Sequence, residues 1–401
     1  MSPEASTVTR DDLIALEDRY ASGLYVKQPI VLARGEGARV WDVDGTEYID
    51  CTSGHGVANV GHAHPWLVEA IARQARRLLT APNGFYSDQR ARLLEKLVRI
   101  APAGLERAYL CNSGAEAVEA AFKFARLSTG RPKIVSTMRG FHGRTMGALS
   151  ATWHKAYRGP FEPLVPGFDF VPYGRPDPMA ETIDGETAAV ILEVVQGEGG
   201  VNPGDGDYLR QVQALCRERG VLFIVDEVQT GFGRTGRMFA SDHYGLQPDV
   251  MCLAKGIAGG VPMGATLLGP RVGELPQKSH GSTFGGNALA CAAALATIRI
   301  LESEDLPRRA AERGAQLIEG LRAIDSPLIR EVRGMGLMVG VQLKAHAGSY
   351  LAALARPIDG LGVLALSAGS TVMRFLPPLV IDEDDVDTVV ARVAAVLEEG
   401  E

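Results

Sequence analysis

Cysteine is scarce in this sequence of 401 residues, and its five cysteines are widely spaced, without a C-x-x-C pair. Such spacing argues against a disulfide framework and a structural zinc site, and we expect no metal. No run of 18 apolar residues occurs, and the charged N-terminal stretch lacks the apolar core of a signal peptide, so we expect a cytoplasmic protein that does not enter a membrane. The formal net charge of −7 gives no support to nucleic acid or an anionic membrane as a partner.

Short apolar runs and helical patterns alternate from about residue 60 to residue 300, without internal repeats or a linker. Such alternation is typical of an α/β domain built on a mostly parallel sheet. The strands that we expect are 108–111, 133–136, 188–194, 221–225, 250–253 and 265–268. The helices that we expect are 65–79, 115–127, 207–219 and 288–304.

The same patterns divide the chain into three parts. Residues 60–304 form the predicted large domain, which carries the sheet and the cofactor site. Residues 305–401 combine two expected strands, 337–343 and 372–376, with a final helix from about Glu383, and predict a smaller α+β domain. Residues 1–59 contain a predicted hairpin but are too few for a core of their own, so we expect them to pack with the small domain.

Two charged residues stand where two apolar runs end: Asp226 after 221–225 and Lys255 after 250–254, each followed by a glycine-rich loop. The carboxyl ends of parallel strands meet at one edge of a sheet, and ligands bind in the crevice there. An amine and a carboxylate at that edge suit pyridoxal 5′-phosphate (PLP), which a lysine holds as a Schiff base while an acidic residue pairs with its ring nitrogen. Taken alone, each residue is equally well explained as a solvated charge at a strand end.

A strand-to-helix junction at residues 112–117 offers a site for the phosphate. The N–H groups and the dipole of the helix attract an anion, Gly114 permits a close approach, and Ser113 adds a hydroxyl. The alternative is an ordinary N-cap. Farther along the chain, Phe141 can stack on a ring and Arg144 can bind a carboxylate through two hydrogen bonds, although packing alone also explains an aromatic residue in a loop.

Glu198 lies in a glycine-rich loop that follows the expected strand 188–194. Arg374 lies in an apolar stretch, where an unpaired charge is costly, so we expect it to pair with Glu198. The alternative for Arg374 is a structural ion pair within the small domain. Another glycine-rich loop, 281–286, carries Thr283, which can reach the phosphate of a neighbouring subunit or belong to a plain tight turn.

Between Ala120 and Phe161 the chain has eight basic and no acidic residues, although acidic residues outnumber basic ones in the whole sequence by 48 to 41. We call residues 120–161 the basic segment. It is either a solvated face or a docking surface for an acidic partner. Its basic residues are Lys123, Arg126, Arg131, Lys133, Arg139, Arg144, Lys155 and Arg158.

Taken together, these motifs resemble those of the class III PLP-dependent aminotransferases of the acetylornithine and ornithine type. The matching stretches are 35–38, 111–117, 141–144, 196–200, 226–236, 254–256, 281–287 and 374–379, in the order of the family and over nearly the whole chain. The resemblance implies the PLP-dependent transferase fold of type I, with a large domain and a smaller α+β domain. It also implies a homodimer whose sites lie at the subunit interface.

The resemblance assigns roles to individual residues. It implies that Lys255 forms the Schiff base and that Asp226 pairs with the ring nitrogen. Arg144 and Ser282 resemble substrate contacts. Glu198 and Arg374 resemble a gate that lets one site accept both glutamate and an ω-amine. The implied cofactor-binding residues are Ser113, Gly114, Ala115, Phe141, Asp226, Glu227, Val228, Gln229, Lys255 and, from the other subunit, Thr283.

Within the family, residues 138–141, 151–153 and 333–338 resemble most the aminotransferases that make lysine through α-aminoadipate. Their substrate is linked to the C-terminal glutamate of a small acidic carrier protein, LysW, which suits the basic segment. We therefore expect an amino group to pass from glutamate, which leaves as 2-oxoglutarate, to the ω-semialdehyde of a LysW-linked lysine precursor. One alternative is an acetylornithine aminotransferase of arginine biosynthesis, or one enzyme for both substrates; another is a PLP-binding protein without turnover.

Overall fold

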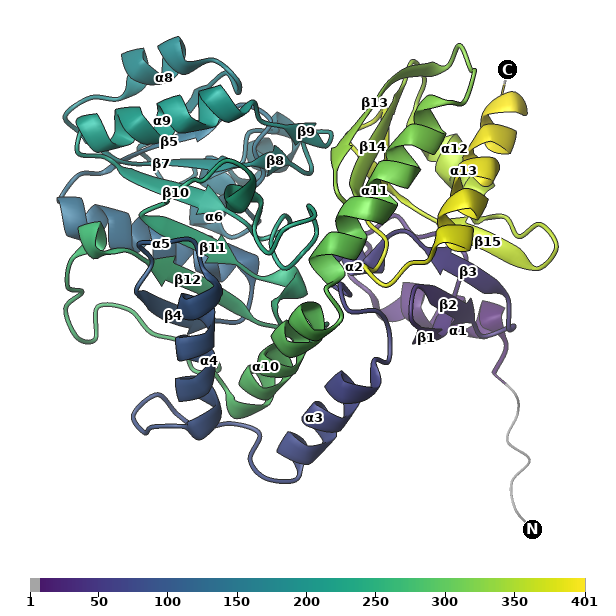
Figure 1. Ribbon diagram of the computed structural model, residues 1–401, viewed down its shortest axis with the longest axis horizontal. Helices are drawn as coiled ribbons and strands as arrows, with labels where there is room; N and C mark the ends of the chain where they lie inside the picture. Colours follow the sequence, from purple (N-terminus) through teal and green to yellow (C-terminus); the bar gives the residue numbers. More distant parts are fainter. Residues whose placement is uncertain (1–7, 401) are drawn as a thin grey trace.

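The computed structural model describes residues 8–400, which gather into two groups of elements with long helices between them (Figure 1). The larger group surrounds a seven-stranded sheet, on the left in Figure 1. The smaller group, on the right, brings the first strands of the chain beside its last helices. Within residues 8–400, none of the helices combines the length and apolarity needed to span a bilayer.

The large sheet has the strand order β4-β12-β11-β10-β7-β5-β6. Only β12 runs antiparallel to its neighbours in this sheet, so the predicted mostly parallel arrangement is confirmed. β7 and β10 are buried along their whole length because helices cover both faces. The strands are β4 (Arg107–Cys111), β5 (Lys133–Thr137), β6 (Phe168–Val171), β7 (Thr187–Glu193), β10 (Leu222–Asp226), β11 (Val250–Leu253) and β12 (Gly264–Leu268).

Alternate residues of the central strands serve two separate cores. Ile191 and Ile224 face α5 (Gly114–Thr129) and α6 (Met146–Ala151) on one side of the sheet. Val190 and Phe223 face α8 (Pro176–Thr182) and α9 (Gly206–Glu218) on the other side, along the top of Figure 1. This alternation follows from the period of two along a strand. The carboxyl ends of the parallel strands remain free to carry a site.

Helices connect the large sheet to the rest of the chain. α10 (Ala288–Ser303) packs against α3 (Pro65–Ala75) and α4 (Asp88–Ile100) in the lower middle of Figure 1. α10 is followed directly by α11 (Leu306–Arg322), which lies against the strands of the smaller group. The predicted helices 65–79 and 288–304 thus correspond to α3 and α10, with α3 ending a turn early.

The smaller group contains two four-stranded sheets. One is antiparallel, in the order β13-β14-β17-β16, and is covered by α11, α12 and α13. The other pairs β3 with β15 in parallel, so residues before 60 are hydrogen-bonded to the C-terminal part. The domain boundaries at 59 and 304 stay a prediction. The elements are α1 (Arg10–Tyr20), β1 (Leu32–Glu36), β2 (Arg39–Asp42), β3 (Glu47–Asp50), β13 (Ile329–Met335), β14 (Met338–Leu343), α12 (Ala347–Ala355), β15 (Leu361–Leu364), β16 (Leu366–Ala368), β17 (Val372–Phe375) and α13 (Glu383–Glu398).

One buried arginine ties the loop after β10 to both ends of the chain. The Arg234 guanidinium donates to the Leu337 carbonyl at 3.0 Å, to the Pro377 carbonyl and to the Asn59 side-chain oxygen at 2.8 Å. Leu337 in turn donates its N–H to the Arg234 carbonyl at 3.0 Å. Because burial is complete, burial lowers the pKa of Arg234 to about 9. The loop beside the site is thereby held against residues from three distant parts of the sequence.

A glycine in α11 sets the distance between that helix and the turn that joins β13 to β14. A Cβ atom at Gly314 would lie 2.2 Å from the Gly336 carbonyl oxygen. We expect Gly314→Val to lower the free energy of unfolding by about 2 kcal/mol or more, because backbone must move to relieve the clash. Denaturant titration followed by circular dichroism measures this loss. In α12, Gly348→Ala is the matched control, since nothing lies within 4 Å of its added methyl group; equal losses for both variants would contradict the prediction.

Candidate active site

The neighbouring strands β10 and β11 bring the two predicted key residues to one edge of the sheet. They run in parallel, with Asp226 opposite Cys252. Asp226 is the last residue of β10, and Lys255 follows β11 after a single intervening residue. Both side chains line one cavity of about 380 Å³. We call this the catalytic cavity.

Asp226 is held in place by two hydrogen bonds. His142 Nδ1 lies 2.7 Å from Asp226 Oδ2, and the backbone N–H of Val228 donates to Oδ1 at 3.0 Å. Burial alone lowers the pKa of His142, but the hydrogen bond and charge of Asp226 outweigh it and raise that pKa. The buried carboxylate is fixed in orientation by these two partners. It can therefore pair with a protonated ring nitrogen.

Lys255 has the properties of a reactive amine. Burial lowers its pKa to about 8, because desolvation of the ammonium group outweighs the attraction of the Glu198 carboxylate. The positive charge of Arg374 lowers it further. Its backbone also adopts a left-handed conformation, with φ of 43°, which is uncommon for a residue with a side chain. The amine thus loses its proton in a range where it can act as a nucleophile or base.

The N-terminus of α5 forms one end of the catalytic cavity. The Ser113 hydroxyl caps the helix by accepting from the Glu116 N–H at 3.2 Å. A Cβ atom at Gly114 would lie 2.7 Å from a Val228 methyl group, so only glycine leaves this cradle open. Ser113, Gly114 and Ala115 all line the cavity. Free N–H groups at the start of a 16-residue helix suit a phosphate.

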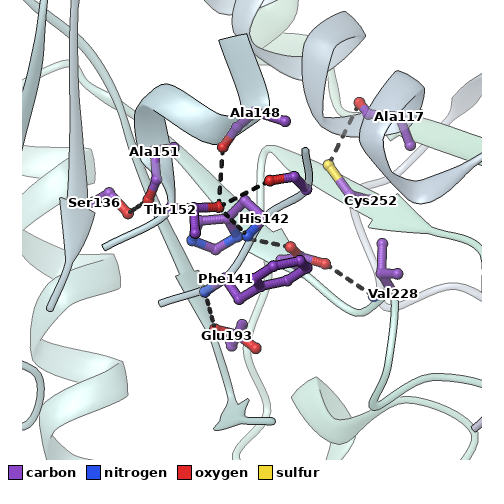
Figure 2. Close-up of polar contacts among 12 residues, drawn as sticks. Ala117, Ser136, Phe141, His142, Ala148, Ala151, Thr152, Glu193, Val228 and Cys252 are labelled. Carbon is purple, nitrogen blue, oxygen red and sulfur yellow. Dashed lines mark hydrogen bonds and ion pairs between the residues drawn. The ribbon is translucent and has the colours of Figure 1, made fainter. Parts of the chain in front are cut away.

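Phe141 and Val228 both line the cavity, and Glu193 fixes the loop that carries Phe141. Figure 2 shows the backbone nitrogen of Phe141 joined to the Glu193 carboxylate, at 3.0 Å. The other oxygen of Glu193 accepts from the Gly197 N–H at 3.1 Å. Burial raises the pKa of Glu193 to about 7. One carboxyl group therefore joins the Phe141 loop to the loop of Glu198.

Glu198 and Arg374 meet at the edge of the catalytic cavity. Arg374 Nη1 donates to Glu198 Oε1 at 2.5 Å and also reaches Gln229 Oε1 at 3.3 Å. The charges of Arg374 and Lys255 hold the pKa of Glu198 below its usual value, although burial alone would raise it. Arg374 is fully buried, and its Nε and Nη2 have no hydrogen-bond partner within residues 8–400. The guanidinium is thus equipped to receive a second carboxylate.

Arg144, Ser282 and Thr283 are among the predicted residues that do not line the cavity. Arg144 is exposed and stacks on Tyr157, with its guanidinium 3.7 Å from the ring centroid, beside Phe141. The Ser282 hydroxyl accepts from the Asn112 side chain at 3.1 Å, next to the phosphate cradle. Thr283 is exposed on the surface of its own chain.

Glu227 uses its carboxylate within the protein. It belongs to the implied cofactor-binding set, but its side chain does not line the catalytic cavity. Its buried carboxylate instead accepts hydrogen bonds from Ser241, through N–H at 2.7 Å and hydroxyl at 2.8 Å, and from Ala240 and Thr230. These bonds fix the loop after β10. The Glu227 side chain is therefore structural.

Sequence reasoning undervalued two residues of the cavity wall. It gave His142 no role, whereas His142 is a hydrogen-bond partner of Asp226. It left Glu193 without a role, although Glu193 lies opposite Asp226 in the β7–β10 register. The alignment of neighbouring strand ends is the signal that identifies Glu193. No local signal in the sequence connects His142 to Asp226.

The donor groups of the cavity fit PLP. Asp226 would pair with a ring nitrogen, Lys255 would supply the amine for an aldehyde, and the α5 N-terminus suits a phosphate. Phe141 and Val228 provide faces between which an aromatic ring can lie, and Gln229 adds a polar group. The cradle at Gly114 stays open only because that residue lacks a side chain.

Comparison with known proteins agrees with this geometry. The model of the family described as aminotransferase class III matches residues 21–397. The [LysW]-aminoadipate semialdehyde transaminase of Deinococcus radiodurans is 49% identical over 387 residues, covering 96% of this chain and 90% of that protein. An acetylornithine aminotransferase of Methanothermobacter thermautotrophicus is 45% identical, covering 95% of this chain and 97% of that protein.

Solved structures show the same fold. The ornithine aminotransferase from Toxoplasma gondii, reported with PLP at its active site, superposes with a TM-score of 0.93 at 34% identity, covering 98% of this chain and 95% of that one. The acetylornithine aminotransferase from Elizabethkingia anophelis gives a TM-score of 0.84 at 33% identity, covering 97% of this chain and 99% of that one. The fold of type I and the large parallel-rich sheet implied by the motifs are thus confirmed.

The depressed pKa of Lys255 is open to direct measurement. In protein freed of PLP, modification of Lys255 by an aldehyde and a reductant should reach half its maximal rate near pH 8, because the neutral amine reacts. For an ordinary lysine, the half-maximal rate of modification lies at about pH 10.4. Mass spectrometry of the labelled peptide gives the rate, and Lys255→Arg is the blank. A midpoint at the ordinary value would refute the effect of burial.

Proposed function

The chain belongs to the class III aminotransferases, which depend on PLP, and from this premise we propose that it transfers an amino group from glutamate to the ω-semialdehyde of a LysW-linked lysine precursor. The D. radiodurans relative, named for a LysW-linked semialdehyde, supports this substrate. The observation that carries the chemistry is the meeting of Lys255 and Asp226 in one cavity, with the Glu198–Arg374 pair at its edge.

A second substrate has support of its own. Relatives that are named acetylornithine aminotransferases are 42–47% identical to this chain. Two relatives named for LysW-linked semialdehydes are 49% and 41% identical to it. Lysine and ornithine derivatives differ by one methylene group but share a blocked α-amino group and a reactive ω-carbon. One site can therefore serve both, and we keep acetylornithine as the alternative. The third alternative, a PLP-binding protein without turnover, does not explain why Lys255, Glu198 and Arg374 are assembled at one site.

In this mechanism the residues of the chain divide the work. PLP, when bound, acts as the electron sink for the bond that breaks at the amine-bearing carbon. The Nζ atom of Lys255 takes the proton from that carbon, for which its pKa of about 8 is well suited. Asp226, oriented by His142, keeps the ring nitrogen protonated. Phe141 and Val228 limit the cavity to a flat ring and exclude water from its faces.

Glu198 and Arg374 let one cavity accept two kinds of amine. When glutamate enters, its α-carboxylate binds the buried Arg374 guanidinium in place of Glu198. When the ω-amine enters, it brings no carboxylate to this end, and Glu198 neutralises Arg374 instead. The exchange requires Glu198 to move, and its loop of glycines allows this.

Replacement of Glu198 by an uncharged isostere tests this exchange. In Glu198→Gln, we expect the half-reaction with the ω-amine to slow about tenfold or more, because Arg374 is left without its neutralising charge. The half-reaction with glutamate should slow less, since the incoming carboxylate replaces Glu198. Stopped-flow absorbance of single half-reactions measures both rates. Glu302→Gln, at an exposed ion pair with Lys96, is the control; equal losses in Glu198→Gln exclude the exchange.

The basic segment supports an acidic carrier only in part. Lys133 is neutralised by Asp169 and Asp184, and Arg131 donates to backbone carbonyls before the start of β5, at the edge of the sheet opposite the site. Lys133 is the only one of the eight basic residues in an ion pair within residues 8–400. Four others lie near Phe141 or in α7 (Lys155–Arg158) and form what we call the basic face: Arg139, Arg144, Lys155 and Arg158.

Charge reversal distinguishes the carrier from a free substrate. We expect Lys155→Glu to raise KM for LysW-linked lysine by about threefold to tenfold at low salt, and to leave KM for acetylornithine nearly constant, because only the linked substrate brings the acidic carrier. Steady-state assays with both substrates, side by side, also rank them in the wild type. Arg217→Glu, at the opposite edge in α9, is the control. A LysW-linked substrate with no advantage over acetylornithine would favour the alternative function.

A homodimer completes the proposed site. Thr283 and Phe284 are exposed, and they adjoin the exposed pair Phe85 and Tyr86 because Asn83 donates to the carbonyls of Ser282 and Gly285. Several large exposed apolar side chains in one place mark an interaction surface. A second copy on this surface would cover them and bring Thr283 toward the phosphate of the other cavity.

A further inference from the structure

A second cavity of about 280 Å³ lies against the catalytic cavity and shares Phe141 and Glu198 with it as a common wall. We call it the aromatic cavity, after Trp153 and Tyr157 in its lining. Gly369, from the C-terminal part, lines it as well. None of the roles derived so far uses this space. Because it shares two lining residues with the catalytic cavity, it is within reach of the far end of a long substrate.

The walls of the aromatic cavity are fixed by packing. The Trp153 ring meets Phe170 edge to face at 5.2 Å, and the backbone N–H of Trp153 donates to the Gly140 carbonyl at 2.9 Å. The Tyr157 ring stands at 87° to the Phe141 ring, with centroids 6.0 Å apart. Phe141 therefore lines both cavities, and its contact with Tyr157 shapes the aromatic cavity. Flat rings held in this way offer faces on which a planar amide can stack.

The charges at the aromatic cavity favour an anion and disfavour an amine. Arg139 lines it, is exposed, and has a left-handed backbone with φ of 65°, a strained state that tends to occur at binding sites. The Arg144 guanidinium lies over Tyr157. The single acidic residue in the lining, Glu198, is already paired with Arg374. A free ammonium group placed here meets uncompensated positive charge, whereas a carboxylate meets a guanidinium.

We propose that the aromatic cavity binds the Nα-acylated end of the ω-amine substrate, with the amide plane against Trp153 and Tyr157 and the carboxylate at Arg139. This inference rests on the proposed function and identifies how the enzyme selects acylated over free diamino acids. Acylation replaces the α-ammonium by a flat, neutral amide, which removes the repulsion and adds stacking. The exposed side of the cavity, at Arg139 and His154, leads a longer acyl group toward the basic face.

Binding without chemistry gives the most direct test. Nα-acetylnorleucine carries the acylated end but no reacting amine, so its affinity reports on the aromatic cavity alone. By isothermal titration calorimetry on the PLP-loaded protein, we expect Trp153→Ala to weaken binding about tenfold or more, and Trp153→Phe to weaken it less. Unchanged affinity in Trp153→Ala overturns the proposal. Circular dichroism and the PLP absorbance band confirm that each variant is folded and loaded.

Selectivity gives the second test. We expect Arg139→Gln to reduce the ratio of kcat/KM for Nα-acetyllysine to that for lysine by about tenfold, because repulsion of the free ammonium falls, whereas loss of the carboxylate's partner affects both substrates alike. Arg217→Gln, far from both cavities, is the matched control. If Arg139→Gln keeps the wild-type ratio, the proposal for the aromatic cavity is overturned. The proposed function still holds in that case, provided that acylated amines are turned over. Absence of that turnover in the wild type refutes the proposed function itself.

Discussion

Parallel pairing of β7, β10 and β11 is the constraint on which the site depends. It places the ends of three strands at one edge of the sheet, where Glu193, Asp226 and Lys255 all face one cavity. The strands are held by burial on both faces, so the positions of these ends are as rigid as the core itself. Loops then need only short spans to bring His142 and Glu198 to the same place.

Several charges are buried around this edge, and each is tolerated because another group satisfies it. Asp226 has His142, Glu198 has Arg374, and the Lys255 amine reduces its cost by losing its proton at lower pH. The arrangement leaves part of the Arg374 guanidinium without a partner. The same physics that makes buried charge expensive thus creates a strong preference for an incoming carboxylate.

Patterns in the sequence predict those parts of the molecule in which burial repeats along a single element. β10 and β11 were predictable to within a residue because both are apolar throughout, and Asp226 and Lys255 stand out as the first charges after them. β6 was not predicted, since it is a four-residue edge strand with an exposed position. The hydrogen bonds of the Glu227 carboxylate to Ala240 and Ser241 were not predicted, because no local pattern connects residues 227 and 240–241. The bond between His142 and Asp226 joins loops far apart in the chain, and no local pattern announces it.

Arg234 has a consequence for how the molecule is made. Its guanidinium is shut off from water and depends on Asn59, from the beginning of the chain, and on the carbonyls of Leu337 and Pro377, near its end. During synthesis on the ribosome the last of these acceptors emerges long after the sheet strands do. Until then the loop beyond β10 carries a charge that cannot be enclosed. The cofactor pocket therefore acquires its final shape only after Leu337 and Pro377 have left the exit tunnel.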